Sequence, residues 1–561
     1  MIPPSISLGN PHRTERRTSA DPSIGIVGAG PGGLATAMLL ARAGCHVTLY
    51  EALPSVGGRT RRLEFGVEDR RFAFDCGPTF FMMPYILEEI FAATGRRLSD
   101  YADLTRLDPM YRLLIGRGEA QAPLQIDATQ DLQRMVRQFA AIEPGDGPAF
   151  LRFMSDNRRK LELMTPILRR PMRSLADLLT VDALRVAPAL TPWKSLYDLL
   201  SSYFTSEQLR LALSFQSKYL GMSPFECPSL FSILSFIEYE YGVWHPRGGC
   251  NALTSAMADV CLELGATIRC NAEVDQLLFE GQRCVGAVVH GTEHRHDHMV
   301  LNADATWAMK RLVPERLRSG RGQGGWSDAQ IDTKRYSCST FMMYLGVRGG
   351  VALPHHTIYT SAHYRQNIED IAVGGTLSND PSIYVCNPSP VDPTLAPAGD
   401  SSLYVLMPTP NTKSGIDWNI ARAVARDRAY TQLEQVFGLE DIRDRVVSEH
   451  LVTPDDWRAE RINHGATFNL AHSLPQMLFR RPQHKLQGFE GLWLVGGGTH
   501  PGSGLPVIFL SAEITARLVC AEAELACPLD AAPSPADPTR PWSKAFRTAM
   551  ATVTTHAEST A

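Results

Sequence analysis

Residues Ser23 to Gly33 read Ser-Ile-Gly-Ile-Val-Gly-Ala-Gly-Pro-Gly-Gly, and this stretch decides the fold of the first part of the chain. Its first five residues form a short apolar run that predicts a buried strand, and the Ala- and Leu-rich residues 34–43 predict a helix. The glycines between them suit a dinucleotide. Gly28 permits the tight turn, Gly30 lets the backbone approach a pyrophosphate and Gly33 lets helix and strand pack closely. The free amides of the helix N-terminus then face phosphate.

The next residues extend this predicted site. His46 to Tyr50 predicts a second strand, and Glu51 stands at its end, where a carboxylate accepts both hydroxyls of an adenosine ribose. Gly57, Gly58 and Arg59 follow, a glycine pair and then a cation that can reach the pyrophosphate. A glycine turn alone is weak evidence for a ligand, and these neighbours strengthen it.

A second glycine cluster lies near the other end of the chain, at Gly496-Gly-Gly-Thr-His-Pro-Gly-Ser-Gly504. We predict that the two clusters are two walls of one cofactor site, so that the ends of the chain meet. The candidate cofactor residues here are Gly496, Gly497, Gly502 and Gly504.

Composition bounds the class of protein. A chain of 561 residues with 44% hydrophobic content predicts two domains. The net charge of -4, without a basic run interleaved with aromatics, excludes a nucleic-acid partner. Eleven scattered cysteines without a CxxC pair indicate free thiols in a reducing compartment. His294, His296 and His298 favour a solvated turn between strands, so we predict no metal site.

Membrane contact is expected to be peripheral. The first 22 residues are weakly basic without the apolar core of a signal peptide, and no apolar run has the length of a membrane span. We therefore expect a cytoplasmic protein. Cations interspersed with apolar residues suit either anionic headgroups or an ordinary charged helix face, and the sequence leaves both open. These cations are Arg158, Arg159, Lys160, Arg169, Arg170 and Arg173.

The motifs together resemble one flavoprotein group. Besides the glycine clusters, they include Phe74-Asp-Cys-Gly-Pro-Thr79 and Thr499-His-Pro-Gly-Ser-Gly504. They are similar to bacterial carotenoid oxidoreductases of the phytoene and diapophytoene desaturase type, within the amine-oxidase-like FAD-dependent superfamily. The likeness runs in order over residues 24 to 520. It implies an α/β fold, with a Rossmann-like FAD-binding domain of the glutathione-reductase kind and a discontinuous α+β substrate domain.

The resemblance also implies the domain boundaries. The FAD-binding domain takes residues 23–98, 245–306 and 487–522, and the substrate and membrane-associating domain takes 99–244 and 307–486. Disordered or linker-like tails occupy 1–22 and 523–561. Within the FAD domain, Val274 is expected to contact the adenine through its backbone. The helix that starts near Leu505 is expected to aim its N-terminus at the flavin, where its dipole stabilises the reduced anion. Residues 319–325 are glycine-rich and predict a flexible loop.

The implied reaction removes a hydride and a proton from a carbon pair beside a conjugated polyene, in carotenoid biosynthesis. A quinone or oxygen is the implied electron acceptor. Asp75 and His500 are the nearest titratable residues within the motifs and the only, weak, catalytic candidates. Val507 follows Pro506, where many forty-carbon desaturases have glycine, and favours a narrower cavity. Two other functions remain open, a carotenoid oxidase or isomerase and a non-catalytic lipid-binding protein similar to Rab GDP-dissociation inhibitors.

Overall fold

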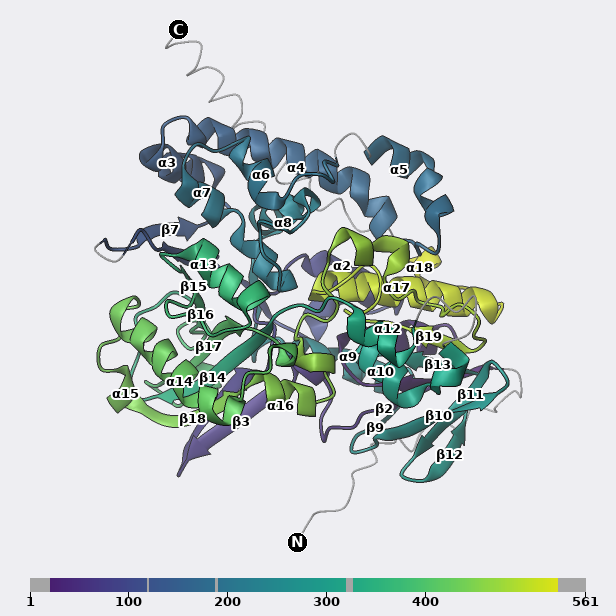
Figure 1. The fold of residues 1–561 in the computed structure, drawn as a ribbon. Coiled ribbons are helices and arrows are strands. Elements are labelled where there is room, and N and C mark those ends of the chain that lie inside the picture. Colours follow the sequence, from purple (N-terminus) through teal and green to yellow (C-terminus); the bar gives the residue numbers. More distant parts are fainter. Residues whose placement is uncertain (1–20, 119–120, 187–189, 319–325, 533–561) are drawn as a thin grey trace.

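The structure, a computed structural model, describes residues 21–118, 121–186, 190–318 and 326–532 (Figure 1). The predicted loop at 319–325, residues 1–20 of the first predicted tail and residues 533–561 of the second lie outside the described residues. The second predicted tail does contain structure near its start, because α18 (Pro528–Ala531) packs against α2 (Pro84–Ala93).

A five-stranded parallel sheet joins the two ends of the chain. Its order is β19-β13-β1-β2-β9, and every neighbouring pair is parallel. The strands are β1 (Ser23–Val27), β2 (His46–Tyr50), β9 (Thr267–Arg269), β13 (His298–Leu301) and β19 (Leu492–Leu494). The helices α1 (Pro31–Arg42), α9 (Asn251–Glu263) and α17 (Leu505–Glu522) pack together, with α1 touching both others. The two ends of the chain therefore meet as predicted, because the glycine clusters follow β1 and β19 of the same sheet.

A three-stranded antiparallel sheet follows β9, formed by β10 (Val274–Glu280), β11 (Arg283–Val289) and β12 (Thr292–Arg295). The three predicted turn histidines lie around its last strand. His294 is in β12, His298 begins β13, and the ring of His296 hydrogen-bonds Ser23 Oγ at 2.8 Å and Tyr50 OH at 2.9 Å. The prediction of a solvated turn was therefore wrong, because His296 ties the side chains of β1 and β2 together.

A seven-stranded mixed sheet forms the second half of the fold. Its order is β18-β14-β17-β16-β15-β6-β7, and only the β15–β6 pair is parallel. The strands are β6 (Tyr111–Ile115), β7 (Leu124–Ala128), β14 (Ser339–Val347), β15 (His356–Thr360), β16 (Ile383–Cys386), β17 (Ser401–Thr409) and β18 (Val446–Val452). Side chains of α14 (Trp418–Gln435) share an apolar core with one face of this sheet.

Smaller elements connect the two sheets. The hairpin of β3 (Arg62–Val67) and β4 (Arg70–Asp75) packs against β18 and β17, and β5 (Leu104–Arg106) pairs with β8 (Trp244–Pro246). The remaining short helices are α10 (Ala305–Leu312), α11 (Glu315–Arg318), α12 (Asp328–Thr333), α13 (Tyr364–Glu369), α15 (Ile442–Arg445) and α16 (Pro454–Ala459).

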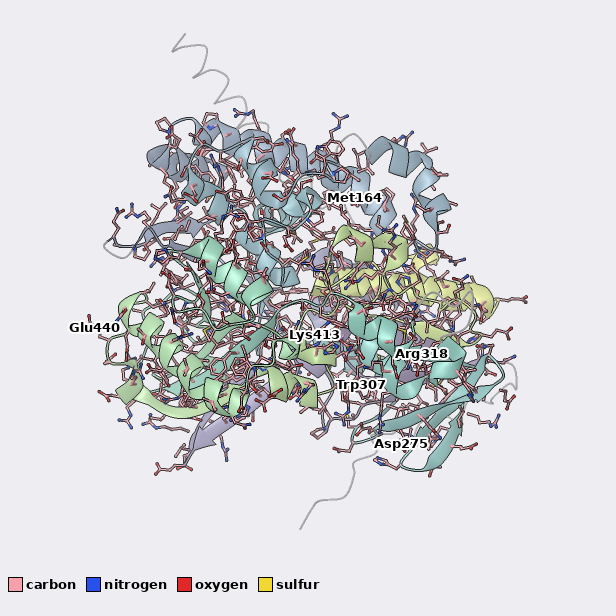
Figure 2. All side chains as sticks on the ribbon, in the orientation of Figure 1. Met164, Asp275, Trp307, Arg318, Lys413 and Glu440 are labelled. Atoms are coloured by element: carbon pink, nitrogen blue, oxygen red, sulfur yellow. The ribbon has the colours of Figure 1, made fainter. Side chains whose placement is uncertain are left out.

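A helical layer lies at the top of Figure 1. It contains α3 (Leu132–Ile142), α4 (Asp146–Leu168), α5 (Val181–Val186), α6 (Leu196–Ser201), α7 (Glu207–Ala212) and α8 (Ser232–Tyr241). Met164, labelled in Figure 2, marks α4 in this layer. No helix within the described ranges combines the length and apolarity needed to cross a bilayer.

The basic residues of α4 and the turn after it face inward to a large extent. Arg158 Nη2 lies 2.7 Å from Glu240 Oε2, and the Nζ of the buried Lys160 donates to Ser232 Oγ at 2.9 Å. Arg169 bridges Glu89 and Glu513, 2.6 and 3.2 Å away. Of the two interpretations left open, the structure favours the charged helix for these three cations, because their partners are protein groups.

Candidate functional site

A cavity of about 820 Å³ is lined from both sheets. Its lining combines the glycine clusters of the parallel sheet with apolar side chains of the seven-stranded sheet. Trp307 and Lys413, both labelled in Figure 2, also line it. The volume lies near the upper end of the range for small-molecule sites, about 300–1,000 Å³.

The first glycine turn has the geometry that the sequence predicts. Gly28 has φ +96° and donates its amide to Tyr50 O at 2.8 Å. A Cβ on Gly33 would lie 2.3 Å from Gly28 O, so only glycine allows this approach of helix and strand. Gly30 caps α1 without a side-chain hydrogen bond, which leaves the first amides of the helix free for an anion. Gly28 and Gly30 line the cavity, and Gly33 lies behind it.

Glu51 is held in place by the backbone. Its Oε2 accepts from the Ala29 amide at 2.7 Å and its Oε1 from the Leu53 amide at 2.9 Å. The residue is only 6% exposed and lines the cavity. Val274, at the start of β10, lines the same region. A fixed carboxylate that keeps free lone pairs suits two neighbouring hydroxyls.

Gly58 and Arg59 come up against the first turn. The Gly57 amide donates to Ala29 O at 2.8 Å, and a Cβ on Gly58 would lie 3.5 Å from Gly30 Cα. Arg59 lines the cavity and donates to the carbonyl of Thr467. Burial lowers the pKa of Arg59, an effect that nearby Asp304 opposes. A guanidinium that lines the cavity suits the binding of an anion there.

Asn302 is a site residue that the sequence interpretation missed. It follows β13, and its Nδ2 donates to Gly28 O at 3.0 Å. A Cβ on Gly32 would lie 2.7 Å from Asn302 Oδ1, and one on Gly496 would lie 3.1 Å from the same atom. Asn302 thus stands between the two glycine clusters and lines the cavity. Its place after a strand at the carboxyl edge of the sheet was the available signal.

The C-terminal glycines divide into two groups. Gly496, Gly497 and Gly504 line the cavity, and Gly504 caps α17 without a side-chain hydrogen bond. Gly502 does not line it, and a Cβ there would lie 2.5 Å from His472 Nε2. The packing of His472 and the φ of +149° therefore both require a glycine at position 502.

The two catalytic candidates lie outside the cavity lining. Asp75 Oδ1 accepts from the amide of Asn251 at 3.3 Å, and therefore braces the first turn of α9. Burial raises the pKa of Asp75 to about 6. His500 is 1% exposed, packs edge-on against His484, and has its pKa lowered to about 4 by burial.

The other end of the cavity is apolar and aromatic. The lining there includes Phe80, Met82, Phe215, Tyr219, Met342, Ile358, Ile383, Tyr384, Tyr404 and Leu406. Residues 220–226 also contribute to the lining, whereas residues 230–236 do not. Val373, which is 79% exposed, also lines the cavity and marks an opening to the surface. Val507 is not in the lining, so it does not narrow this space directly.

A buried polar cluster adjoins the aromatic end. Ligand atoms of His355, His356 and Cys386 lie within 4.8 Å of one another. The existing contacts use several of these atoms, since His355 Nδ1 lies 3.8 Å from Cys386 Sγ and His356 Nδ1 lies 2.7 Å from Tyr384 OH. The three side chains therefore belong to a buried cluster that is held together by these contacts.

Flavin-dependent oxidoreductases match this chain over most of its length. A family model described as flavin containing amine oxidoreductase matches residues 31–520. A 4,4'-diapophytoene desaturase (4,4'-diapolycopene-forming) of Methylomonas sp is 40% identical over 88% of this chain and 94% of its own. An all-trans-zeta-carotene desaturase of Myxococcus xanthus is 39% identical over 89% and 93%.

Solved structures share the fold at low identity. The cyclohexylamine oxidase of Brevibacterium oxydans has a TM-score of 0.54 at 15% identity, over 90% of this chain and 100% of its own. An oxidoreductase of Methanosarcina mazei has a TM-score of 0.54 at 18% identity, over 87% and 98%.

Proposed function

Since the chain belongs to the flavin containing amine oxidoreductase family, we propose that it is a desaturase of carotenoid precursors. The cofactor is FAD, and the chain is an FAD-dependent oxidoreductase. The observation that carries the proposal is the single cavity in which a dinucleotide cradle continues into an apolar, aromatic space. Relatives whose names state carotenoid and diapophytoene desaturation support the same substrate class.

The cradle fits FAD residue by residue. Glu51 would accept the ribose hydroxyls, the free amides of α1 and the Arg59 guanidinium would hold the pyrophosphate, and the backbone of Val274 would face the adenine. The uncapped N-terminus of α17 at Gly504 would face the flavin ring, where a helix dipole favours negative charge. When bound, FAD supplies the hydride acceptor.

The aromatic end would orient the polyene and exclude water. A polyene spreads the positive charge that develops when a hydride leaves, so the protein's main task is to align the reacting carbon pair. The faces of Phe80, Tyr219 and Tyr384 offer further stabilisation of that charge, since aromatic faces attract cations.

We also propose the two-domain division from this arrangement. Residues 23–98, 245–306 and 487–522 contribute all five strands of the parallel sheet, which supports their assignment to FAD binding. Residues 99–244 and 307–486 contribute all seven strands of the mixed sheet and α3 to α8, which supports their assignment to substrate and membrane contact.

Peripheral membrane attachment is proposed through a patch around α5. We define this α5 patch as Leu175, Leu179, Val181 and Trp193, whose exposed fractions are 63%, 76%, 62% and 78%. Exposed cations Arg173 and Arg185 lie in the same segment. Large apolar side chains left exposed beside cations are typical of a surface that inserts among anionic lipids.

Liposome co-sedimentation tests this attachment. Trp193→Glu and Leu179→Glu are expected to reduce binding to vesicles that contain anionic lipid by about tenfold, because each places a carboxylate among headgroups. Ile420→Glu is the matched control, since Ile420 is 71% exposed on α14, outside the α5 patch. An equal loss for all three variants would contradict attachment through this patch.

The function itself is tested with FAD-loaded protein and liposomes carrying either phytoene or diapophytoene, without oxygen and with a quinone. We expect longer-wavelength polyene absorption bands, and the polyene that responds identifies the chain length. Turnover only of an already conjugated carotenoid would instead assign an oxidase or isomerase. Replacing the quinone by oxygen then distinguishes the two electron acceptors.

A further inference from the structure

The hydroxyl of Tyr384 connects the cavity to the buried polar cluster. Tyr384 lies on β16 and lines the aromatic end. Its OH lies 2.6 Å from Thr79 Oγ1 and 2.7 Å from His356 Nδ1. The His356 side chain is fully buried, and its Nε2 has no hydrogen-bond partner among the described residues. A tyrosine that lines the cavity thus has its hydroxyl hydrogen-bonded to a buried imidazole.

This hydroxyl lies where the cofactor cradle meets the aromatic end. Thr79 comes two residues after Gly77, where a Cβ would lie 2.8 Å from the carbonyl oxygen of Arg59. Phe80 follows Thr79 and stacks on the His356 ring, with centroids 4.1 Å apart and planes 18° apart. The Thr79–Tyr384–His356 chain is therefore fixed from both sides, by the cradle segment and by ring stacking.

We propose that Tyr384 takes up the proton that leaves the polyene and relays it to His356. The inference rests on the proposed desaturation. One C–H bond breaks with its electron pair, as a hydride that bound FAD would accept. The neighbouring C–H bond breaks as a proton, and its electron pair becomes the new C=C bond. The proton forms an O–H bond with Tyr384 as the tyrosine's own proton moves to His356 Nδ1. After the product leaves, the same path returns the proton to the cavity and restores the neutral imidazole.

The electrostatics suit an acceptor that is neutral before each turnover. Burial first, and then His355 and His245, hold the pKa of His356 well below its usual range. A weak base suffices, because a carbon beside a polyene cation gives up its proton readily. Burial also holds the pKa of Tyr384 well above its usual range, so the tyrosine acts as a relay and not as a tyrosinate.

The titratable groups that surround His356 come from several elements. His355 has its ring 4.2 Å away, and the His245 ring packs 4.7 Å from that of His355. His245 Nε2 lies 3.0 Å from Asp392 Oδ2. Cys386 contacts His355, and Asp75 acts on Cys386 electrostatically.

Tyr384→Phe and His356→Gln test the relay. Both are expected to lower kcat about 100-fold or more, with KM, the polyene dissociation constant and FAD content within about twofold of wild type. The isotope effect on kcat for a polyene deuterated at the carbon that loses the proton is expected to rise, as this C–H cleavage becomes limiting in His356→Gln. The control is Tyr344→Phe, because the buried Tyr344 donates its hydroxyl to the carbonyl of Cys76 and does not line the cavity.

The outcomes separate this relay from the proposed function. A wild-type protein that converts no polyene overturns the function and the relay with it. A wild type that desaturates, with Tyr384→Phe or His356→Gln keeping kcat within about twofold, overturns the relay alone. Where one variant fails to fold, the other decides. Stoichiometric zinc in the purified protein that is lost in His356→Gln would assign the cluster to a metal and also overturn the relay.

Discussion

The substitution Glu51→Gln tests the placement of the ribose end of FAD. It keeps the shape of the side chain, but it replaces one carboxylate oxygen by an amide nitrogen. In the structure both oxygens already accept backbone hydrogen bonds, from Ala29 at 2.7 Å and Leu53 at 2.9 Å. In the variant, the amide nitrogen can only donate. It therefore loses the hydrogen bond that the oxygen accepted, either from one of these backbone amides or from a ribose hydroxyl.

The expected effect is the loss of one charge-assisted hydrogen bond, about 1.5–3 kcal/mol, which corresponds to FAD binding that is about 10- to 150-fold weaker. Titration of FAD into apoprotein, followed by flavin fluorescence, measures this change. Glu64→Gln is the control, because the Glu64 side chain is 55% exposed on β3 and pairs with Arg62. A Glu51→Gln protein that binds FAD within twofold of wild type would refute this position for the ribose.

Three further substitutions test other parts of the account. Gly33→Ala places a Cβ 2.3 Å from Gly28 O, so we expect the free energy of unfolding to fall by about 1–3 kcal/mol in urea denaturation. We also expect the flavin content, measured by absorbance, to fall. The control Gly350→Ala, whose Cβ has open space around it, should change neither quantity. Burial raises the pKa of Glu238 to about 7, above its unfolded value, so the folded state binds the proton more tightly and stability falls as pH rises from about 4.5 to 7. Glu238→Gln is expected to remove a slope worth on the order of 1–3 kcal/mol across that window, and an unchanged slope would contradict the burial argument. Arg169→Met leaves Glu89 and Glu513 without their shared cation, so we expect about 3 kcal/mol of destabilisation and unchanged liposome binding. A selective loss of liposome binding would show instead that Arg169 contacts lipid.

The cofactor half of the fold could be predicted because its signals are local. Apolar runs next to glycines mark β1 and β2, and the structure has both strands at the predicted residues. Gly28, Gly30 and Gly33 likewise have the conformations and contacts that their spacing indicates. These features depend on residues close in sequence, where periodicity and turn chemistry are informative.

The features that the sequence left open or did not show depend on partners that are distant in sequence. Arg169 pairs with Glu89 and Glu513, which lie 80 and 344 residues away along the chain, so the local sequence does not show that its side chain faces inward. Gly502 is required by His472, a contact that no motif announces. His355 and His356 are adjacent in the sequence, but only the folded structure shows that Tyr384 contacts His356. The direction in which a charged side chain points, and the residues that gather into a buried cluster, are set by tertiary contacts.

The central claim is tested most directly by anaerobic mixing of the FAD-loaded protein with phytoene or diapophytoene in liposomes, without any added acceptor. We predict bleaching of the oxidised flavin band, with one new carbon–carbon double bond in the polyene for each flavin reduced. A flavin that stays oxidised with both polyenes, and is reduced by a simple amine instead, would contradict the account.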